Sequence, residues 1–278
     1  MDAIEFQKAE IERDSMMGRI RTGTGALIIN ADDWGFDRIT TDRTLDCVHR
    51  NSVSAVSAMV YMSDSERAAS LAQEIGVDAG LHFNFSQPFT APASDRKLSE
   101  HHRRVVSYLR FHPLARVLYH PGLAKSFRYV IEAQLAEFER LYGRRPLRVD
   151  GHHHLHLCAN VLSDKLLPEG TIARRNFSFR AGEKSRLNRL YRKSIDRKLE
   201  KRHRTVDFLF ALTPLEPISR LERIFSLAHR YIVELETHPA NETEYRLLSS
   251  GRIFQTAEDF PSVSGFGACC RTETHGHV

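Results

Sequence analysis

Short apolar runs alternate along the chain with longer segments in which apolar residues recur every three or four positions. The short runs are typical of buried strands, because they are mainly apolar and end in turn-forming residues. Seven such runs occupy residues 26–30, 52–62, 77–85, 147–150, 171–177, 205–212 and 230–239. Alternating strands and helices predict parallel βαβ units, in either a closed barrel or an open doubly wound sheet. The number of strands favours a barrel, and an incomplete one is compatible with the pattern.

Helix signals fill several gaps between these runs. Residues 63–66 resemble an N-cap before an apolar periodic stretch that stops at Gly76, and residues 129–142 form an amphipathic pattern closed by glycine. The segment 187–199 has apolar residues at helical spacing among many Lys and Arg residues. Residues 87–125 contain four prolines and four histidines without such a pattern. We therefore expect a loop there that shapes the pocket.

The pattern predicts one domain rather than two. A chain of 278 residues can bury a full core in a single α/β unit, which we place at residues 26–248. Residues 1–25 lack strand and capped-helix signals, which predicts a flexible N-terminal tail. The pattern weakens again after residue 248, so residues 249–278 are expected to form a partly flexible C-terminal extension.

Composition is ordinary for a globular protein, with 41% hydrophobic and 27% charged residues. No apolar run approaches the roughly 18 residues that a membrane-spanning helix needs, and the first 25 residues contain no secretory signal. The four cysteines show no C-x-x-C spacing, so we expect reduced thiols. These features predict a cytoplasmic protein.

The net charge of +5 is unevenly distributed. Between Arg174 and Arg204 there are 13 Lys or Arg residues and three acidic residues. We predict a basic amphipathic helix near residues 183–204, either docked on the barrel or resting on anionic lipid at the inner membrane surface. Nucleic-acid binding is disfavoured, because no recognisable reading module accompanies the charge.

Polar side chains gather where the predicted strands end. The C-terminal ends of parallel strands meet at one face of a barrel or sheet, so these side chains should lie together. They are Asn30, Asp32 and Asp33, then His82, then Asp150, His152, His153, His154 and His156, and finally Glu236 and His238. Carboxylates and imidazoles on one rim are typical of a catalytic divalent metal site with a carboxylate left as a base.

Adjacent Asp32 and Asp33 cannot point the same way on a regular strand. One of them can bind metal while the other faces the attacking water. Two plainer interpretations remain open: the Asp-Asp-Trp-Gly sequence can be a polar turn in which Asp33 caps the next helix, and His82 alone can be a hydrogen-bonded core histidine.

Four of these stretches resemble, in order, the motifs of the YdjC-like carbohydrate deacetylases. They are N-A-D-D-W-G (30–35), G-L-H-F-N (80–84), V-D-G-H-H-H-L-H (149–156) and E-T-H-P (236–239). That family includes chitooligosaccharide deacetylases and deacetylases of hopanoid glycolipid pathways. The resemblance covers roughly residues 26–240 and implies a deformed (β/α) TIM-like barrel. It also implies metal-dependent removal of an N-acetyl group from an amino sugar, either in an oligosaccharide or linked to a lipid.

The resemblance also assigns residues to roles. Asp33, His82 and His152 match the ligands of one divalent metal ion, either Mg²⁺ or Zn²⁺. Asp32 matches the general base that deprotonates the metal-activated water, and His238 matches the acid that protonates the leaving amine. His156 is an alternative ligand. The candidates for contacting substrate or supporting the ligands are Asn30, Trp34, Asn84, Asp150, His153, His154, His156 and Arg174.

Some positions depart from the family pattern. Trp34 replaces the common Phe or Tyr, Gly151 stands where Ser is frequent, and residues 86–89 lack the glycine that usually precedes the proline. These departures lie near the expected sugar, so they bear on the substrate rather than on the reaction. A metal-dependent phosphoester hydrolase and a non-catalytic carbohydrate-binding protein are the alternative functions, and a homo-oligomer is compatible with the sequence.

Overall fold

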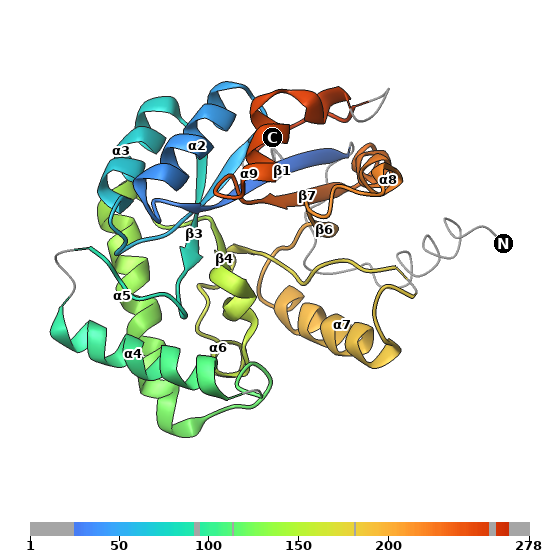
Figure 1. Cartoon of the computed structure of the whole chain (residues 1–278). Coiled ribbons are helices and arrows are strands. Elements are labelled where there is room, and N and C mark those ends of the chain that lie inside the picture. Colours follow the sequence, from blue (N-terminus) through green and yellow to red (C-terminus); the bar gives the residue numbers. More distant parts are fainter. Residues whose placement is uncertain (1–24, 92–94, 113, 181, 256–259, 267–278) are drawn as a thin grey trace, which may run out of the picture.

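The computed structural model describes residues 25–91, 95–112, 114–180, 182–255 and 260–266. Seven parallel strands form one curled sheet in the order β5-β4-β3-β2-β1-β7-β6 (Figure 1). The strands are β1 Ala26–Trp34, β2 Ala55–Ala58, β3 Asp78–Phe83, β4 Arg148–Gly151, β5 Ile172–Ala173, β6 Phe208–Ala211 and β7 Ile232–Thr237. The prediction of a deformed barrel with seven parallel strands is confirmed.

The barrel is incomplete between its edge strands β5 and β6. Ile172 forms an isolated parallel bridge with Arg204, which precedes β6. Further along, the amide of Ser178 donates to the carbonyl of Leu209 at 2.8 Å. An irregular seam therefore takes the place of the continuous hydrogen-bonded ladder that closes a regular barrel.

Helices surround the sheet on its outer side. They are α2 Arg38–His49, α3 Ser65–Ile75, α4 Arg96–Phe111, α5 Ala124–Tyr142, α6 Ala159–Ser163, α7 Arg186–Glu200, α8 Ile218–Ala228 and α9 Glu242–Ser249. Short 3₁₀ turns lie at η1 Pro121–Leu123, η2 His152–Leu157 and η3 Arg252–Gln255. Among the described residues, no helix has the length and apolar character needed to span a bilayer.

The prediction of a loop over residues 87–125 is wrong for the middle of that segment. Helix α4 occupies Arg96–Phe111 and packs against α5 (Figure 1). Its buried residues Leu98, His102 and Val105 lie at helical spacing. Because a histidine takes the central buried position, the apolar periodicity was incomplete in the sequence.

Alternate residues of the strands face two different environments. On β1, Leu27, Ile29 and Ala31 pack under the helices in the main apolar cluster. Ile28 points inside the barrel, where it packs in a small apolar layer with Ile232 and others. The same alternation places Asn30 and Asp32 on the inner side further along β1, since side chains alternate with a period of two. The inner side of the barrel is thus apolar at the N-terminal ends of the strands and polar at their C-terminal ends.

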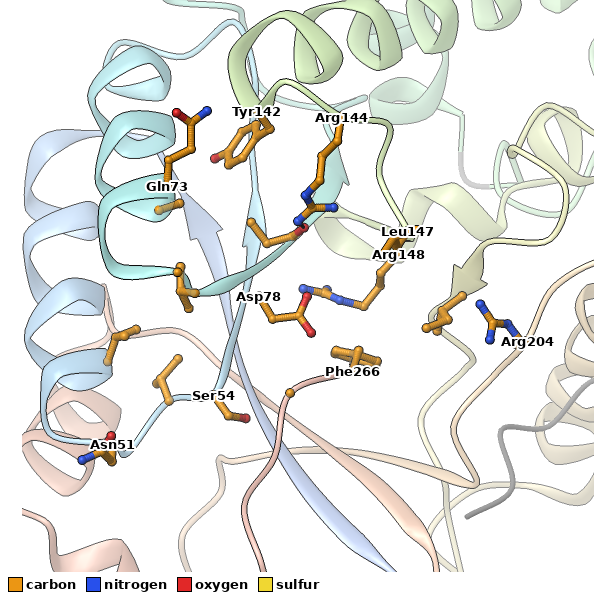
Figure 2. Close-up of a pocket in the computed structure, with 18 residues that line it drawn as sticks. Asn51, Ser54, Gln73, Asp78, Tyr142, Arg144, Leu147, Arg148, Arg204 and Phe266 are labelled. Atoms are coloured by element: carbon orange, nitrogen blue, oxygen red, sulfur yellow. Dashed lines mark hydrogen bonds between the residues drawn. The ribbon is translucent and has the colours of Figure 1, made fainter. Parts of the chain in front are cut away.

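The described part of the predicted C-terminal extension packs against the barrel. Val263 forms a parallel bridge with Leu27, and Phe266 is buried with its ring centre 4.3 Å from Cζ of Arg148. Both residues line a cavity of about 670 Å³, and Figure 2 shows Phe266 beside Arg148. Asp78 and Leu147, from the N-terminal ends of strands, line the same cavity, so it lies at the end of the barrel away from the histidine cluster. The predicted tail lies outside the described residues, apart from its last residue.

Candidate metal centre

Three side chains meet at the C-terminal ends of β1, β3 and β4. Oδ1 of Asp33 lies 3.4 Å from Nε2 of His82 and 2.8 Å from Nδ1 of His152. One ligand atom from each residue lies within 4.8 Å of the others. The structure therefore brings the three residues that were predicted as ligands close enough to share one metal ion.

His82 has the environment of a metal-binding imidazole. The ring is buried, its Nδ1 lies 2.7 Å from Oδ1 of Asp150, and its Nε2 has no hydrogen-bond partner among the described residues. A histidine whose second nitrogen is held by a carboxylate is the usual arrangement in metal sites. Burial lowers the pKa of His82, but the carboxylates of Asp32 and Asp150 outweigh burial and raise it to about 10. The surroundings of Nε2 thus favour a positive charge.

The backbone at Asp33 explains how two adjacent aspartates reach one site. The register between β1 and β2 shifts between Ala31 and Trp34, and Asp33 has a left-handed φ of 65°. This conformation is costly for a residue other than glycine and is held where the surroundings over-determine it. Burial raises the pKa of Asp33, but the hydrogen bond with His152 and the nearby imidazole of His82 outweigh it and hold that pKa well below the usual value.

Asp32 is clamped from inside the barrel by Arg174. The two terminal nitrogens of Arg174 donate to the two carboxylate oxygens of Asp32, at 2.6 and 2.7 Å. Arg174 is buried, and it also donates to Glu234 at 2.8 Å and to Glu236 at 3.0 Å. A planar guanidinium with five N–H donors can hold several carboxylates at once. Arg174 therefore fixes the orientation of Asp32.

The barrel interior contains more buried carboxylates than cations. Asp32, Asp150, Glu234 and Glu236 are buried around two guanidinium groups, those of Arg148 and Arg174. Burial raises the pKa of Glu234, with Arg174 opposing it. At Glu236 burial also favours the neutral form, but Arg174 and His154 lower the pKa to about 2. Besides the two guanidinium groups, the imidazole of His82 compensates these carboxylates through its contact with Asp150.

The two oxygens of Asp32 differ in their remaining capacity. Oδ1 accepts hydrogen bonds from Arg174 and, at 2.8 Å, from Nδ2 of Asn30. Oδ2 accepts one from Arg174, and it lies 3.9 Å from Nε2 of His82 and 4.0 Å from Nε2 of His238. Since a carboxylate oxygen has two lone pairs, Oδ2 can accept a further proton or hydrogen bond on the side that faces the histidines.

His238 lies at the open side of this group. Its backbone N–H donates to Oε2 of Glu244 at 2.6 Å, and its side chain is 38% exposed. Burial lowers the pKa of His238, but the charges of Asp32 and Glu236 outweigh it and raise the pKa. A protonated imidazole that solvent can reach is suited to donating a proton.

The other predicted residues differ in their positions. His154 lies 3.1 Å from Glu236, and His153 lies 3.1 Å from the hydroxyl of Ser86. Asn84 is buried and accepts hydrogen bonds from the amides of residues 86 and 87, so it shapes the loop that reaches His153. These side chains border the cluster or support its border.

Two predicted residues point away from the cluster. Nε2 of His156 lies 2.9 Å from the carbonyl oxygen of Arg174, and burial lowers the pKa of His156 to about 3. The neutral imidazole of His156 donates to this backbone carbonyl and so holds the Arg174 segment in place. Among the described residues, His156 belongs to none of the groups of side chains that could share a metal ion. Trp34 is fully buried under α3, where its indole N–H donates to the carbonyl of Ala68 at 3.0 Å.

The sequence reasoning missed several residues of the interior. Ser57 donates to Asp150 at 2.6 Å and accepts from Arg148 at 2.8 Å. A Cβ at Gly80 would lie 2.7 Å from Cζ of Arg148, so this glycine leaves room for the guanidinium. A signal for the interior was present in β7, where acidic Glu234 and Glu236 alternate with buried apolar residues.

Two further groups of side chains could hold a metal ion. They are Asp32 with His82 and Asp150, and Asp32 with Glu236 and His238. Arg174 forms ion pairs with every carboxylate in these two groups, whereas none of its ion pairs with the described residues involves Asp33. Because a guanidinium beside the ligands repels a metal cation, the group of Asp33, His82 and His152 is the most favourable of the three.

Comparison with known proteins places the chain in a family. Residues 26–262 match the family model described as YdjC-like protein, so the chain belongs to that family. It is 30% identical over 141 residues to a carbohydrate deacetylase of Mus musculus, covering 49% of this chain and 44% of the relative. It is also 30% identical over 138 residues to a chitooligosaccharide deacetylase of Yersinia pestis, covering 49% of this chain and 52% of the relative. The matched region thus spans about half the length of these curated relatives.

A solved structure shares the fold. It is a putative cellobiose-phosphate cleavage protein of Enterococcus faecalis V583, with a TM-score of 0.58 and 19% identity over 84% of this chain and 93% of that one.

Proposed function

We propose that the protein is a metal-dependent hydrolase that removes the acetyl group from an N-acetylated amino sugar. Membership of the YdjC-like family and the deacetylase names of the matched relatives support the reaction class. The single observation that carries the metal dependence is the unpartnered Nε2 of buried His82, which faces Asp33 beside His152.

The donor set fits one divalent ion. Asp33, His82 and His152 would hold it through one carboxylate oxygen and two imidazole nitrogens. This set suits zinc better than magnesium, which prefers oxygen ligands. When bound, such an ion supplies a Lewis acid that polarises the acetyl carbonyl and acidifies a water molecule.

The remaining steps fall to residues of this chain. Asp32 would accept the proton of the attacking water at Oδ2, the oxygen with spare capacity, while Arg174 and Asn30 hold the carboxylate in place. His238 would then donate a proton to the nitrogen of the departing amine. The products would be acetate and a free amino sugar.

The reaction is tested by acetate release from N-acetylglucosamine, chitobiose and a lipid-linked N-acetylhexosamine. The protein is first treated with a chelator and then assayed with and without added Zn²⁺ or Mg²⁺. Release that depends on added metal would support the proposal and identify the substrate class. Protein that binds metal but releases no acetate from any of the three would instead favour the phosphoester hydrolase or a binding role.

Two variants separate the metal from the base. Asp32→Asn should bind Zn²⁺ like the wild type, while turnover falls by about 10²- to 10⁴-fold because the base is lost. His82→Ala should lose Zn²⁺ binding, measured by calorimetry, together with turnover. His101→Ala, whose ring contacts the hydroxyl of Ser126 on α5, is a matched control and should change neither quantity. Full activity in Asp32→Asn would refute the assignment of the base.

A further inference from the structure

Helix α7 presents two different faces. Leu199 is buried and Ile195 is partly buried against the core, so these two residues dock the helix on the barrel. Leu187, Leu190 and Tyr191 are instead 81%, 64% and 42% exposed. The apolar residues whose spacing predicted an amphipathic helix are therefore divided between an inner, docked face and an outer, exposed face. The outer apolar side chains have no covering partner in the described part of the chain.

The outer face of α7 leads to a lysine at its C-terminal end. Leu187, Tyr191 and Lys198 are separated by four and seven positions, so they lie along one side of the helix. Arg186 is exposed at the start of the helix. Nζ of Lys198 lies 3.5 Å from the hydroxyl of Ser163 on α6. The outer face thus combines apolar side chains with cations and continues onto α6.

A cavity of about 320 Å³ adjoins this face, between α6 and the end of α7. Val161, Leu162, Leu167 and Leu199 contribute its apolar wall, and Lys165, Lys198, Lys201 and Arg202 its cationic rim. Arg202 pairs with Glu169 at 3.2 Å. For the three lysines, no ion pair is formed with any residue that the structure describes. An apolar pocket with unpaired cations at its edge suits a molecule with an acyl chain and an anionic head group.

More exposed apolar side chains lie on the other side of α6. Leu114 is 58% exposed and Leu118 is 54% exposed, in the segment between α4 and α5. This segment is attached to α6, because the amide of Ala159 donates to the carbonyl of Arg116 at 3.0 Å and the hydroxyl of Tyr119 donates to Asp164 at 3.3 Å. Helix α6 lies between α4 and α7 in Figure 1, and exposed apolar residues lie both on α7 and in the segment that follows α4.

We propose that the α7 surface, formed by Leu187, Leu190, Tyr191, Lys198 and Lys201, docks on an anionic lipid bilayer. The apolar side chains would enter the boundary between head groups and acyl chains, while the cations would contact the anionic head groups. A nucleic acid would satisfy the cations but would leave the leucines in water. The bilayer accounts for both, and the cavity beside Lys198 accommodates part of one lipid.

The test is flotation of the full chain with vesicles, and it does not require turnover. The protein should float with vesicles of equal parts phosphatidylcholine and phosphatidylglycerol and remain behind with phosphatidylcholine alone. Each cation near an anionic surface contributes roughly fivefold to affinity, so Lys198→Glu with Lys201→Glu should weaken binding by about 25-fold or more. Leu187→Ser with Leu190→Ser should weaken it by roughly tenfold at the same lipid composition.

Matched controls lie elsewhere on the surface. Ile39 on α2 is 66% exposed, and the side chain of Arg145 is 86% exposed. Ile39→Ser and Arg145→Glu should float like the wild type, and circular dichroism should show the same folded state for every variant. Absence of flotation with anionic vesicles would overturn the proposal, as would equal loss in the controls. Dimerisation or duplex DNA binding that depends on Leu187 and Leu190, without flotation, would also overturn it. Because binding is measured directly, failure here leaves the proposed deacetylation untouched.

Discussion

Replacing Arg174 with methionine removes the cation on which the carboxylates inside the barrel depend. The guanidinium is fully buried and forms ion pairs with Asp32, Asp150, Glu234 and Glu236. Breaking a buried ion pair by removing one partner costs about 3–5 kcal/mol, because the other charge stays buried without compensation. We expect Arg174→Met to lose about this much free energy of unfolding at pH 8, which corresponds to a fall in Tm on the order of 10 °C.

The loss should depend on pH in a defined direction. In the wild type, Arg174 holds the pKa of Asp150 well below its usual value and that of Glu236 near 2, against the effect of burial. These lowered values add stability that is present above the unfolded-state pKa and disappears as the pH falls through the folded-state pKa. In the variant we expect burial to raise the same pKa values above those of the unfolded chain, so that protonation favours the folded state. The deficit should therefore be smaller at pH 5.5 than at pH 8.

The measurement is urea unfolding in the presence of a chelator. Trp34 is the only tryptophan and is buried, so its fluorescence reports unfolding of the core. Arg174→Lys keeps a charge without the planar fork and should recover part of the loss. Arg145→Met, at an exposed pair with Glu139, should show no measurable change. A loss below about 1 kcal/mol at pH 8, or a deficit that grows as the pH falls, would refute the reasoning.

Two further substitutions test the packing around Arg148. Gly80→Ala places a Cβ against the Arg148 guanidinium and should lower the free energy of unfolding by about 1–3 kcal/mol in the same urea titration. An unchanged midpoint of unfolding would mean that Arg148 moves aside without cost. Phe266→Ala removes a buried ring at the N-terminal ends of the strands and should lower the free energy of unfolding by about 3–5 kcal/mol. An unchanged free energy of unfolding would show that residues 260–266 do not stabilise the barrel.

The sequence predicted the architecture because strand signals depend on local composition. The predicted run at 26–30 lies in β1, and the one at 230–239 contains all of β7, whereas the run at 52–62 contains only four strand residues, Ala55–Ala58. Local apolarity does not define where hydrogen bonding to neighbours stops. Helix α4 was missed for the related reason that His102 fills a position where the pattern needs an apolar residue.

The candidate site was predicted as a set of residues but not as a geometry. Strand ends brought Asp33, His82 and His152 together, as expected from parallel strands. The sequence could not show that Arg174 is the centre of a buried charge network, because its partners are spread along the chain, from Asp32, 142 positions away, to Glu234, 60 positions away on the other side. Nor could it show that His156 faces a backbone carbonyl, because an imidazole can either bind a metal or donate a hydrogen bond and the residue type alone does not decide between the two.

The place of β1 in the sheet has a consequence for biosynthesis. One of its neighbours is β2, which follows shortly in the chain, but the other is β7, and Ile28 pairs with Glu234, about two hundred residues later. At ribosomal rates of about 5–20 residues per second, the apolar strand β1 waits on the order of 10–40 s for that partner. An unpaired apolar strand edge is a template for association with other chains. The nascent polypeptide is therefore most exposed to aggregation, and to chaperone binding, before β7 has left the ribosome.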